Sequence, residues 1–123
     1  MTAKQHGVPS FSDLEGFLQA YKSGELRANG IILATPTHTH TAMAKLFVGS
    51  GLAVFIEKPL APTGEEGRQF LEISKADSHS VYMVGHHRRH NCFVRAIKDV
   101  LEKKQLGRVV AVNGGEAIKP RLN

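Results

Sequence analysis

Apolar residues recur at the three- and four-residue spacing of an amphipathic helix in four segments of the chain. Two of these segments begin with a capping box, Ser12 with Glu15 and Thr63 with Glu66, in which side chains satisfy the free amides of a helix start. The pattern therefore predicts helices that follow Ser12 and end at Gly24, span about Thr39 to Val48, follow Thr63, and span about Asn91 to Lys104.

Short unbroken apolar runs lie between and after these helices, at residues 30–34, 53–56, 81–84 and 109–112. Such runs are typical of strands in parallel sheets that are covered on both faces. Strands that alternate with helices of this length indicate right-handed crossovers and an α/β fold with a parallel sheet. The last helix should bury a stripe formed by Phe93, Ile97, Val100 and Leu101.

The glycine pair Gly49 and Gly51 is similar to the start of a dinucleotide fingerprint but stands in the wrong place. The fingerprint needs a strand before it and a helix after it, so that the pyrophosphate meets a helix N-terminus. Here the two glycines follow a helix and precede a strand, and Val54 holds the third glycine position. We interpret them as a helix stop. The sequence also contains no Walker-type phosphate loop.

Composition narrows the function classes. The 123 residues suffice for about one domain, and 16 Lys and Arg against 11 Asp and Glu give a formal net charge of +5. The basic residues are dispersed, with only two tyrosines and no tryptophan for base stacking, so we expect no nucleic-acid partner. A small anionic ligand such as a nucleotide phosphate would use the same charge.

Three features of the sequence bear on where the protein is located in the cell. No apolar stretch reaches the roughly 18 residues of a membrane span, and Met1–His6 lacks the apolar core of a secretory signal. The only cysteine is Cys92, which fits a reducing compartment. We therefore expect a cytoplasmic protein without a membrane partner, and we interpret Cys92 as an inert thiol.

Polar and ring-forming residues gather where three of the predicted strands end. These ends are Thr35-Pro36, Glu57-Lys58-Pro59 and Gly85-His86. Ligands of parallel α/β sheets bind beyond the carboxyl ends of the strands, so this edge is the candidate site. An ammonium at Lys58 could stabilise negative charge that develops on a substrate oxygen, although a surface lysine in a turn would give the same pattern.

Histidines offer a second kind of site. His38 and His40 on one segment, and His86, His87 and His90 on another, could supply imidazole ligands to zinc. The second group lies in a segment that is predicted to be a loop between a strand and a helix, where no fixed ligand spacing holds. We therefore predict no metal.

Three motifs in order, A-T-P-T-H-T-H at residues 34–40, V-F-I-E-K-P-L at 54–60 and V-G-H-H-R-R-H-N at 84–91, resemble successive motifs of the Gfo/Idh/MocA oxidoreductase family. The similarity runs from about Val8 to Val112, and the E-K-P element makes it specific. Members have a Rossmann domain followed by an α/β substrate domain. The resemblance implies hydride transfer between NAD or NADP and a hydroxyl carbon of a sugar, cyclitol or polyol.

By this resemblance, residues 1–90 are the later part of a Rossmann domain, which lacks its first strands. Residues 91–123 are then a connecting helix and the first strand of a second domain. The glycine fingerprint and the catalytic Asp and His of the family have no counterpart in this sequence. We therefore expect weak or absent turnover from this chain alone, and one interpretation is that it is part of a longer gene product.

The resemblance also assigns roles to residues. Lys58 matches the catalytic lysine of E-K-P, and Arg89 with Asn91 matches an R-x-N pattern that contacts the nicotinamide end or the substrate. The implied cofactor-binding residues are Thr35, Pro36, His40, Glu57, Lys58, Pro59, Arg89 and Asn91. Where the family has proline after the asparagine, this chain has Cys92.

A second hypothesis comes from a different class. Without the first Rossmann strands, a sheet edge or an apolar face would be left uncovered, which favours association with another copy. The chain would then be a non-catalytic interaction or oligomerisation module derived from the same fold. Saturable cofactor binding by a monomer would favour the enzyme, and a dimer that does not respond to cofactor would favour the module.

Overall fold

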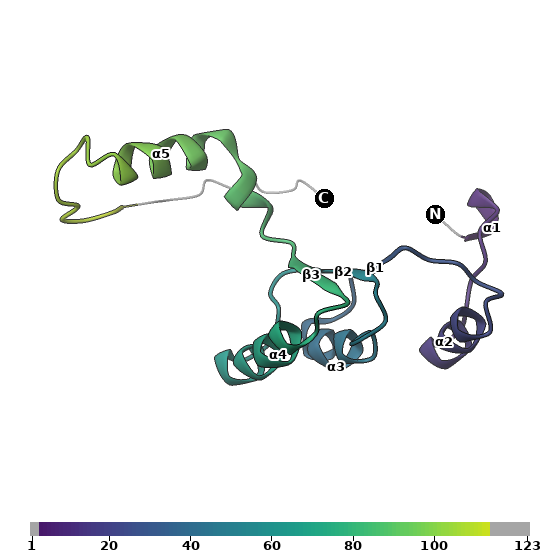
Figure 1. Ribbon diagram of the computed structural model, residues 1–123. Helices are drawn as coiled ribbons and strands as arrows, with labels where there is room; N and C mark the ends of the chain where they lie inside the picture. Colours follow the sequence, from purple (N-terminus) through teal and green to yellow (C-terminus); the bar gives the residue numbers. More distant parts are fainter. Residues whose placement is uncertain (1–2, 114–123) are drawn as a thin grey trace. The chain divides into compact units, whose positions relative to one another are not determined.

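A computed structural model describes residues 3–113 (Figure 1). The chain divides into two compact units, one up to Gly85 and the other from His86 onward. The elements of the first unit are α1 (Ala3–His6), α2 (Leu14–Lys22), β1 (Gly30–Leu33), the 3₁₀ helix η1 (Thr37–Thr39), α3 (His40–Lys45), β2 (Ala53–Ile56), α4 (Gly64–Ala76) and β3 (Val81–Val84). The second unit contains the 3₁₀ helix η2 (His87–His90) and α5 (Cys92–Glu102).

The sheet of the first unit confirms the predicted parallel α/β architecture. Its three strands are parallel in the order β1-β2-β3, with Gly30 opposite Ala53 and Ala53 opposite Val81. Helices α3 and α4 lie on one face of the sheet (Figure 1). On that side a core forms from Leu33, Ala44, Phe47, Leu52, Val54, Ile56 and Phe70.

Helix α2 contributes to the same core. Its Phe17 ring lies 6.4 Å from the ring of Phe47 in an edge-on arrangement, and it stacks on Tyr21. The predicted capping box at its start is wrong. Asp13 is the N-cap, since its Oδ1 accepts the amide of Gly16 at 2.8 Å, while Ser12 donates to the Asp13 carboxylate. Both residue types cap helices well, and the carboxylate adds a favourable charge at the N-terminus.

The turns around α3 and α4 follow the glycine and threonine signals. Gly49 and Gly51 both have φ of 74° and lie in the turn that joins α3 to β2, so the predicted helix stop at these glycines lies four residues beyond the last residue of α3, Lys45. The predicted helix over residues 39–48 is shorter, because its start is the 3₁₀ turn η1 and its α-helical part ends at Lys45. The capping role of Thr63 is confirmed, since its Oγ1 accepts the amide of Glu66 at 3.2 Å.

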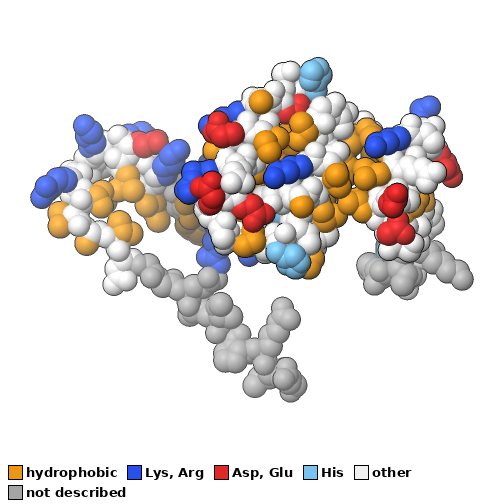
Figure 2. Space-filling model, turned by 90° about the horizontal axis from the view of Figure 1, so that it is seen from below, with side chains coloured by type: hydrophobic (Ala, Val, Ile, Leu, Met, Phe, Trp, Pro, Cys, Tyr) orange, Lys and Arg blue, Asp and Glu red, His pale blue; other side chains and the backbone are white. Residues whose placement is uncertain are grey.

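The outward surface of the two helices is polar with apolar patches between. Figure 2 shows acidic and basic side chains interspersed on this side of the molecule. On α4 they include the ion pairs Glu65–Arg68 and Glu72–Lys75 at 3.0 and 2.9 Å. Such exposed pairs contribute little to stability. None of the helices within residues 3–113 has both the length and the apolar character to cross a bilayer.

The opposite face of the sheet is apolar and exposed. Ile32 is 75 % exposed, Val81 68 % and Met83 47 %, and none of the helices between residues 3 and 85 covers them (Figure 1). The outer edge of β1 has no strand beside it within residues 3–113. This agrees with the expectation of an uncovered apolar face and sheet edge.

Two predictions for the second unit are wrong. The stripe on α5 is not buried, since Phe93 is 75 % and Ile97 61 % exposed. Residues 109–112 form no strand. Both failures have the same cause. The spacing of apolar residues shows which side of a segment is apolar, but burial of a helix face or pairing of a strand needs a second element beside it. Neither α5 nor residues 109–112 has such an element in the described part of this unit.

Candidate functional site

The turn after β1 is held by a short chain of hydroxyl groups. Thr39 donates from its Oγ1 to the carbonyl of Pro36 at 2.8 Å, and its amide donates to the same oxygen at 2.9 Å. The Oγ1 atoms of Thr35 and Thr39 lie 2.8 Å apart, and the Thr35 hydroxyl also lies 3.4 Å from Met43 Sδ, to which it can donate. The hydroxyl of Thr35 is thus fixed toward η1. Thr39 is the N-cap of α3, but its side chain makes no capping hydrogen bond to that helix.

The turn after β2 carries Glu57, Lys58 and Pro59. Glu57 continues the sheet by donating its amide to the Leu33 carbonyl at 2.8 Å. Its carboxylate accepts the amide of Lys58 at 2.8 Å, so Glu57 fixes the backbone of the lysine. The Lys58–Pro59 peptide bond is cis, and the side chains of both residues are exposed.

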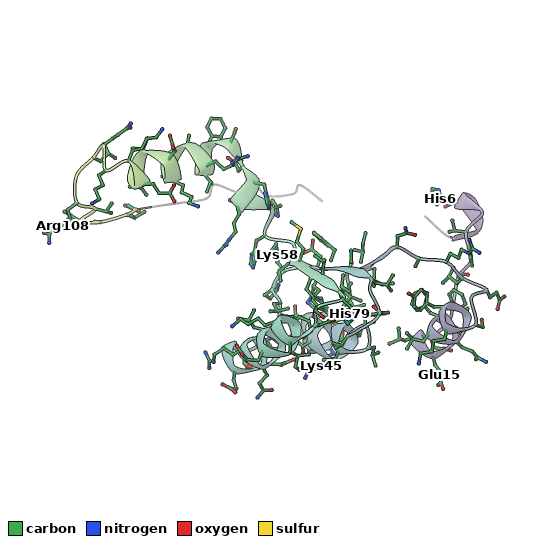
Figure 3. All side chains as sticks on the ribbon, viewed as in Figure 1. His6, Glu15, Lys45, Lys58, His79 and Arg108 are labelled. Atoms are coloured by element: carbon green, nitrogen blue, oxygen red, sulfur yellow. The ribbon has the colours of Figure 1, made fainter. Side chains whose placement is uncertain are left out.

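The ammonium of Lys58 is available for a ligand. Figure 3 shows this side chain beside the carboxyl ends of the strands, whereas His79 lies at their opposite end. Within residues 3–113 no hydrogen bond or ion pair engages the Lys58 amine. A cation therefore stands unengaged at the edge where parallel α/β sheets bind ligands.

His40 joins the two turns. It is 1 % exposed, and its Nδ1 lies 2.9 Å from the Pro59 carbonyl oxygen while its Nε2 lies 2.7 Å from that of Thr35. Both ring nitrogens are thus bound to backbone. The family resemblance implies that His40 lies at the cofactor, which stays a prediction; in the structure the ring links the segments that carry Thr35 and Lys58.

A second link, between α3 and α4, was not predicted. The hydroxyl of Thr41, which is 2 % exposed, donates to the carboxylate of Glu66. The sequence gave Glu66 a role only in the capping box with Thr63. Nothing in the spacing of residues 25 positions apart signals this contact, because it arises from packing of the two helices.

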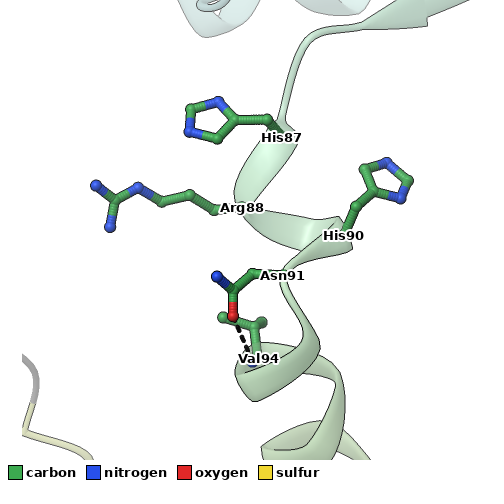
Figure 4. Close-up of a pocket in the computed structure, with 5 residues that line it drawn as sticks. All are labelled: His87, Arg88, His90, Asn91 and Val94. Carbon is green, nitrogen blue, oxygen red and sulfur yellow. Dashed lines mark hydrogen bonds between the residues drawn. The ribbon is translucent and has the colours of Figure 1, made fainter.

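Arg89 and Asn91 belong to the second unit, and their expected contact with the nicotinamide end or the substrate stays a prediction. Asn91 is the N-cap of α5, and its Oδ1 accepts the amides of Phe93 and Val94 at 2.9 and 3.4 Å. Arg89 lies on η2 and is exposed. A shallow hollow on this unit is lined by His87, Arg88, His90, Asn91 and Val94 (Figure 4).

The opposite end of the sheet holds a structural carboxylate rather than a ligand site. Asp77 accepts the amides of Gly49 and His79, both at 2.9 Å, and the hydroxyl of Tyr82 at 2.8 Å. These bonds, led by the Gly49 amide, hold the pKa of Asp77 far below its usual value. Burial, with the carboxylate beside it, raises the pKa of Tyr82.

The candidate metal ligands do not converge. Among residues 3–113 no group of three or more His, Cys, Asp or Glu side chains is placed to hold a metal ion. The thiol of Cys92 is free and exposed. The chemistry at this edge is therefore that of a cation, a carboxylate and hydroxyl groups.

Residues 1–86 match the sequence profile GFO_IDH_MocA, which describes an oxidoreductase family with an NAD-binding Rossmann fold. The chain belongs to this family. A levoglucosan dehydrogenase of Pseudarthrobacter phenanthrenivorans is 34 % identical over 82 residues, which are 67 % of this chain and 21 % of that protein. An inositol 2-dehydrogenase of Rhizobium meliloti is 30 % identical over 84 residues, or 68 % of this chain and 25 % of the relative.

Solved structures of Gfo/Idh/MocA type agree with the fold. The WlbA dehydrogenase from Bordetella pertussis, in complex with NADH and UDP-GlcNAcA, has a TM-score of 0.73 and 25 % identity, and the match covers 86 % of this chain and 29 % of that one. A myo-inositol 2-dehydrogenase from Lactobacillus plantarum, at 21 % identity and a TM-score of 0.72, shows the same fold. The chain thus spans about a quarter of the length of these relatives.

Proposed function

We propose that this chain forms the later part of the NAD(P)-binding domain of an oxidoreductase that acts on a hydroxyl group of a sugar, cyclitol or related polyol. The observation that carries the proposal is the free ammonium of Lys58, which stands at the carboxyl end of β2 in a turn that His40 ties to Thr35. The family match and the activities named for its relatives support the substrate class.

The exposed groups at this edge suit one half of a dinucleotide. In the Rossmann strand order 3-2-1-4-5-6, the cofactor lies across the point where the order reverses, which is beside strand 4. We assign β1, β2 and β3 to positions 4, 5 and 6, because they are parallel and consecutive. The cation and hydroxyls there fit the ribose and nicotinamide of either NAD or NADP, whereas a pyrophosphate needs a glycine-rich turn at a helix start.

The chemistry follows from the groups on the chain. A bound nicotinamide would supply the hydride acceptor or donor. Lys58 would donate hydrogen bonds to the substrate oxygen and stabilise the negative charge that develops there. Glu57, which holds the Lys58 amide, would keep that turn in place. Thr35, Pro36 and Pro59 would form the surface against which the cofactor rests.

Two residues of the second unit are also assigned to ligand binding. Arg89 and Asn91 would reach the nicotinamide end or the substrate through the guanidinium and the Asn91 amide nitrogen, since the Asn91 oxygen already caps α5. We assign residues 1–90 to the Rossmann domain, and residues 91–123 to a connecting helix and the start of a substrate domain.

Cofactor binding by the isotope-labelled chain tests this proposal. Titration with NADH to millimolar concentration, followed by NMR, should shift the amide signals of residues 35 and 57–60. Lys58→Ala should weaken binding roughly tenfold, about 1.4 kcal/mol, as expected for a lost hydrogen bond from a charged group. Lys45→Ala is the matched control, because Lys45 is an exposed lysine on α3 (Figure 3).

Two results would contradict the assignment. One is an equal loss of affinity in Lys58→Ala and Lys45→Ala, which would indicate non-specific attraction of the phosphates. The other is a set of shifted signals confined to the opposite end of the strands, around residues 77–80.

The exposed apolar face of the sheet favours a second candidate, a non-catalytic interaction module. Ile32 and Val81 present apolar surface that another copy of the chain could cover. Size-exclusion chromatography with and without NADH separates the two functions. A dimer whose elution does not respond to NADH, together with absent NADH binding, would favour the module.

A further inference from the structure

The buried ring of His40 faces two acceptors and no donor. Its partners are the main-chain carbonyl oxygens of Thr35 and Pro59, at 2.7 and 2.9 Å from Nε2 and Nδ1. Both distances are those of true hydrogen bonds. A carbonyl oxygen has no proton to give, so each of these bonds needs an N–H on the histidine.

A neutral imidazole cannot satisfy this arrangement. It carries one N–H, and its other nitrogen would direct a lone pair at a carbonyl oxygen in a site that water does not reach. Buried acceptors without a donor are rare in folded proteins. Only the imidazolium form, in which both nitrogens carry protons, makes both bonds at once.

We propose that His40 is a doubly protonated clamp that sets the spacing between the turn bearing Thr35 and the turn bearing Lys58. It is a positioning residue, since both nitrogens are used and neither is free for a ligand. That the spacing matters for a cofactor rests on the proposed function, whereas the clamp itself does not.

Ionisable side chains stand on or directly after three of the elements that pack against α3. The elements that pack against α3 are η1, β1, β2 and α4. His38 lies on η1, and Glu57 and Lys58 directly follow β2. On α4, Glu66 accepts the hydroxyl of Thr41, the residue that follows His40 in the chain. β1 carries no ionisable side chain.

The protonation of the ring can be observed directly in the unaltered chain. Proton–nitrogen NMR of the side chains should show bound protons on both nitrogens of His40 at neutral pH, with slow exchange. The His40→Asn variant identifies which of the seven histidine signals belongs to this ring. Exposed His38 serves as the internal comparison. A bare nitrogen on His40 at neutral pH would overturn the proposal.

Two variants test the positioning role. The amide nitrogen of His40→Asn can replace Nδ1, and that of His40→Gln can replace Nε2, so each keeps one bond of the clamp and breaks the other. We expect both to lower NADH affinity three- to tenfold while His38→Gln leaves it unchanged. Unchanged affinity in both His40 variants would refute the positioning role. If the unaltered chain does not bind NADH, the proposed function fails and the ring protons still decide the clamp.

Discussion

Removal of the Leu52 side chain should greatly lower the free energy of unfolding of the first unit. Leu52 is 4 % exposed and packs in the core with Phe47 and Val54. Leu52→Ala loses the transfer free energy of the side chain and leaves a cavity, which together cost about 2–5 kcal/mol. Small domains have only about 5–15 kcal/mol in total. The variant should therefore unfold at a much lower urea concentration.

Leu46→Ala is the matched control, because Leu46 lies on the same segment and is 52 % exposed. Full burial of a leucine contributes about 1.5–3 kcal/mol, so a half-exposed one that leaves no cavity should cost about 1 kcal/mol or less. The same chemical change at two sites six residues apart thus isolates the effect of burial.

Tyrosine fluorescence during urea unfolding measures the difference. The chain has no tryptophan and two tyrosines, Tyr21 and Tyr82, both in the first unit, so the signal reports that unit alone. The midpoint should shift while the slope of free energy against urea stays the same. Equal costs for the two variants, or a cost below about 1 kcal/mol for Leu52→Ala, would refute the placement of the core.

Further variants test Asp77 at the opposite end of the sheet, Gly85 directly after β3 and Gly67 inside α4. The amide partners of Asp77 hold its pKa low, so the ionised carboxylate stabilises the fold above about pH 4, and this contribution is lost as the pH falls below that value. In Asp77→Asn the free energy of unfolding should therefore fall less steeply between about pH 5 and 2 than in the unaltered chain. An equal fall in both proteins would contradict this. In Gly85→Ala the new Cβ would lie 2.9 Å from Phe55 Cζ, so the variant should lose about 1–3 kcal/mol in urea unfolding. Gly67→Ala, inside α4 with only ordinary contacts around its Cβ, should gain about 0.5–1 kcal/mol, and a loss there would show that the helix is packed more tightly than described.

The strands were predictable because their signal is local. Each is a short run dominated by apolar residues, and glycine or polar residues stand within two positions of it on both sides. The first helix start was misassigned because Ser12 and Asp13 are adjacent and both residue types cap helices, so composition could not separate them.

The site was predictable as a place but not as a network. Strand ends located Thr35 and Lys58, since the topology of a parallel sheet gathers its carboxyl ends. The role of His40 depends on two backbone carbonyls, one of them 19 residues away. Because every residue has a backbone carbonyl, the residue types do not show which of them a histidine will contact. The exposed apolar stripe of α5 was mispredicted for a similar reason, because the spacing of apolar residues does not show which element, if any, packs against them.

The strand order β1-β2-β3 means that each strand pairs with its immediate predecessor in the chain. During synthesis, which runs from the N-terminus, every newly emerged strand therefore finds its template already in place. Each pairing closes a loop of one crossover only, as between Gly30 and Ala53 or between Ala53 and Val81, and the entropy of closing a longer loop is avoided. Growth of the sheet can thus keep pace with the ribosome, one crossover at a time.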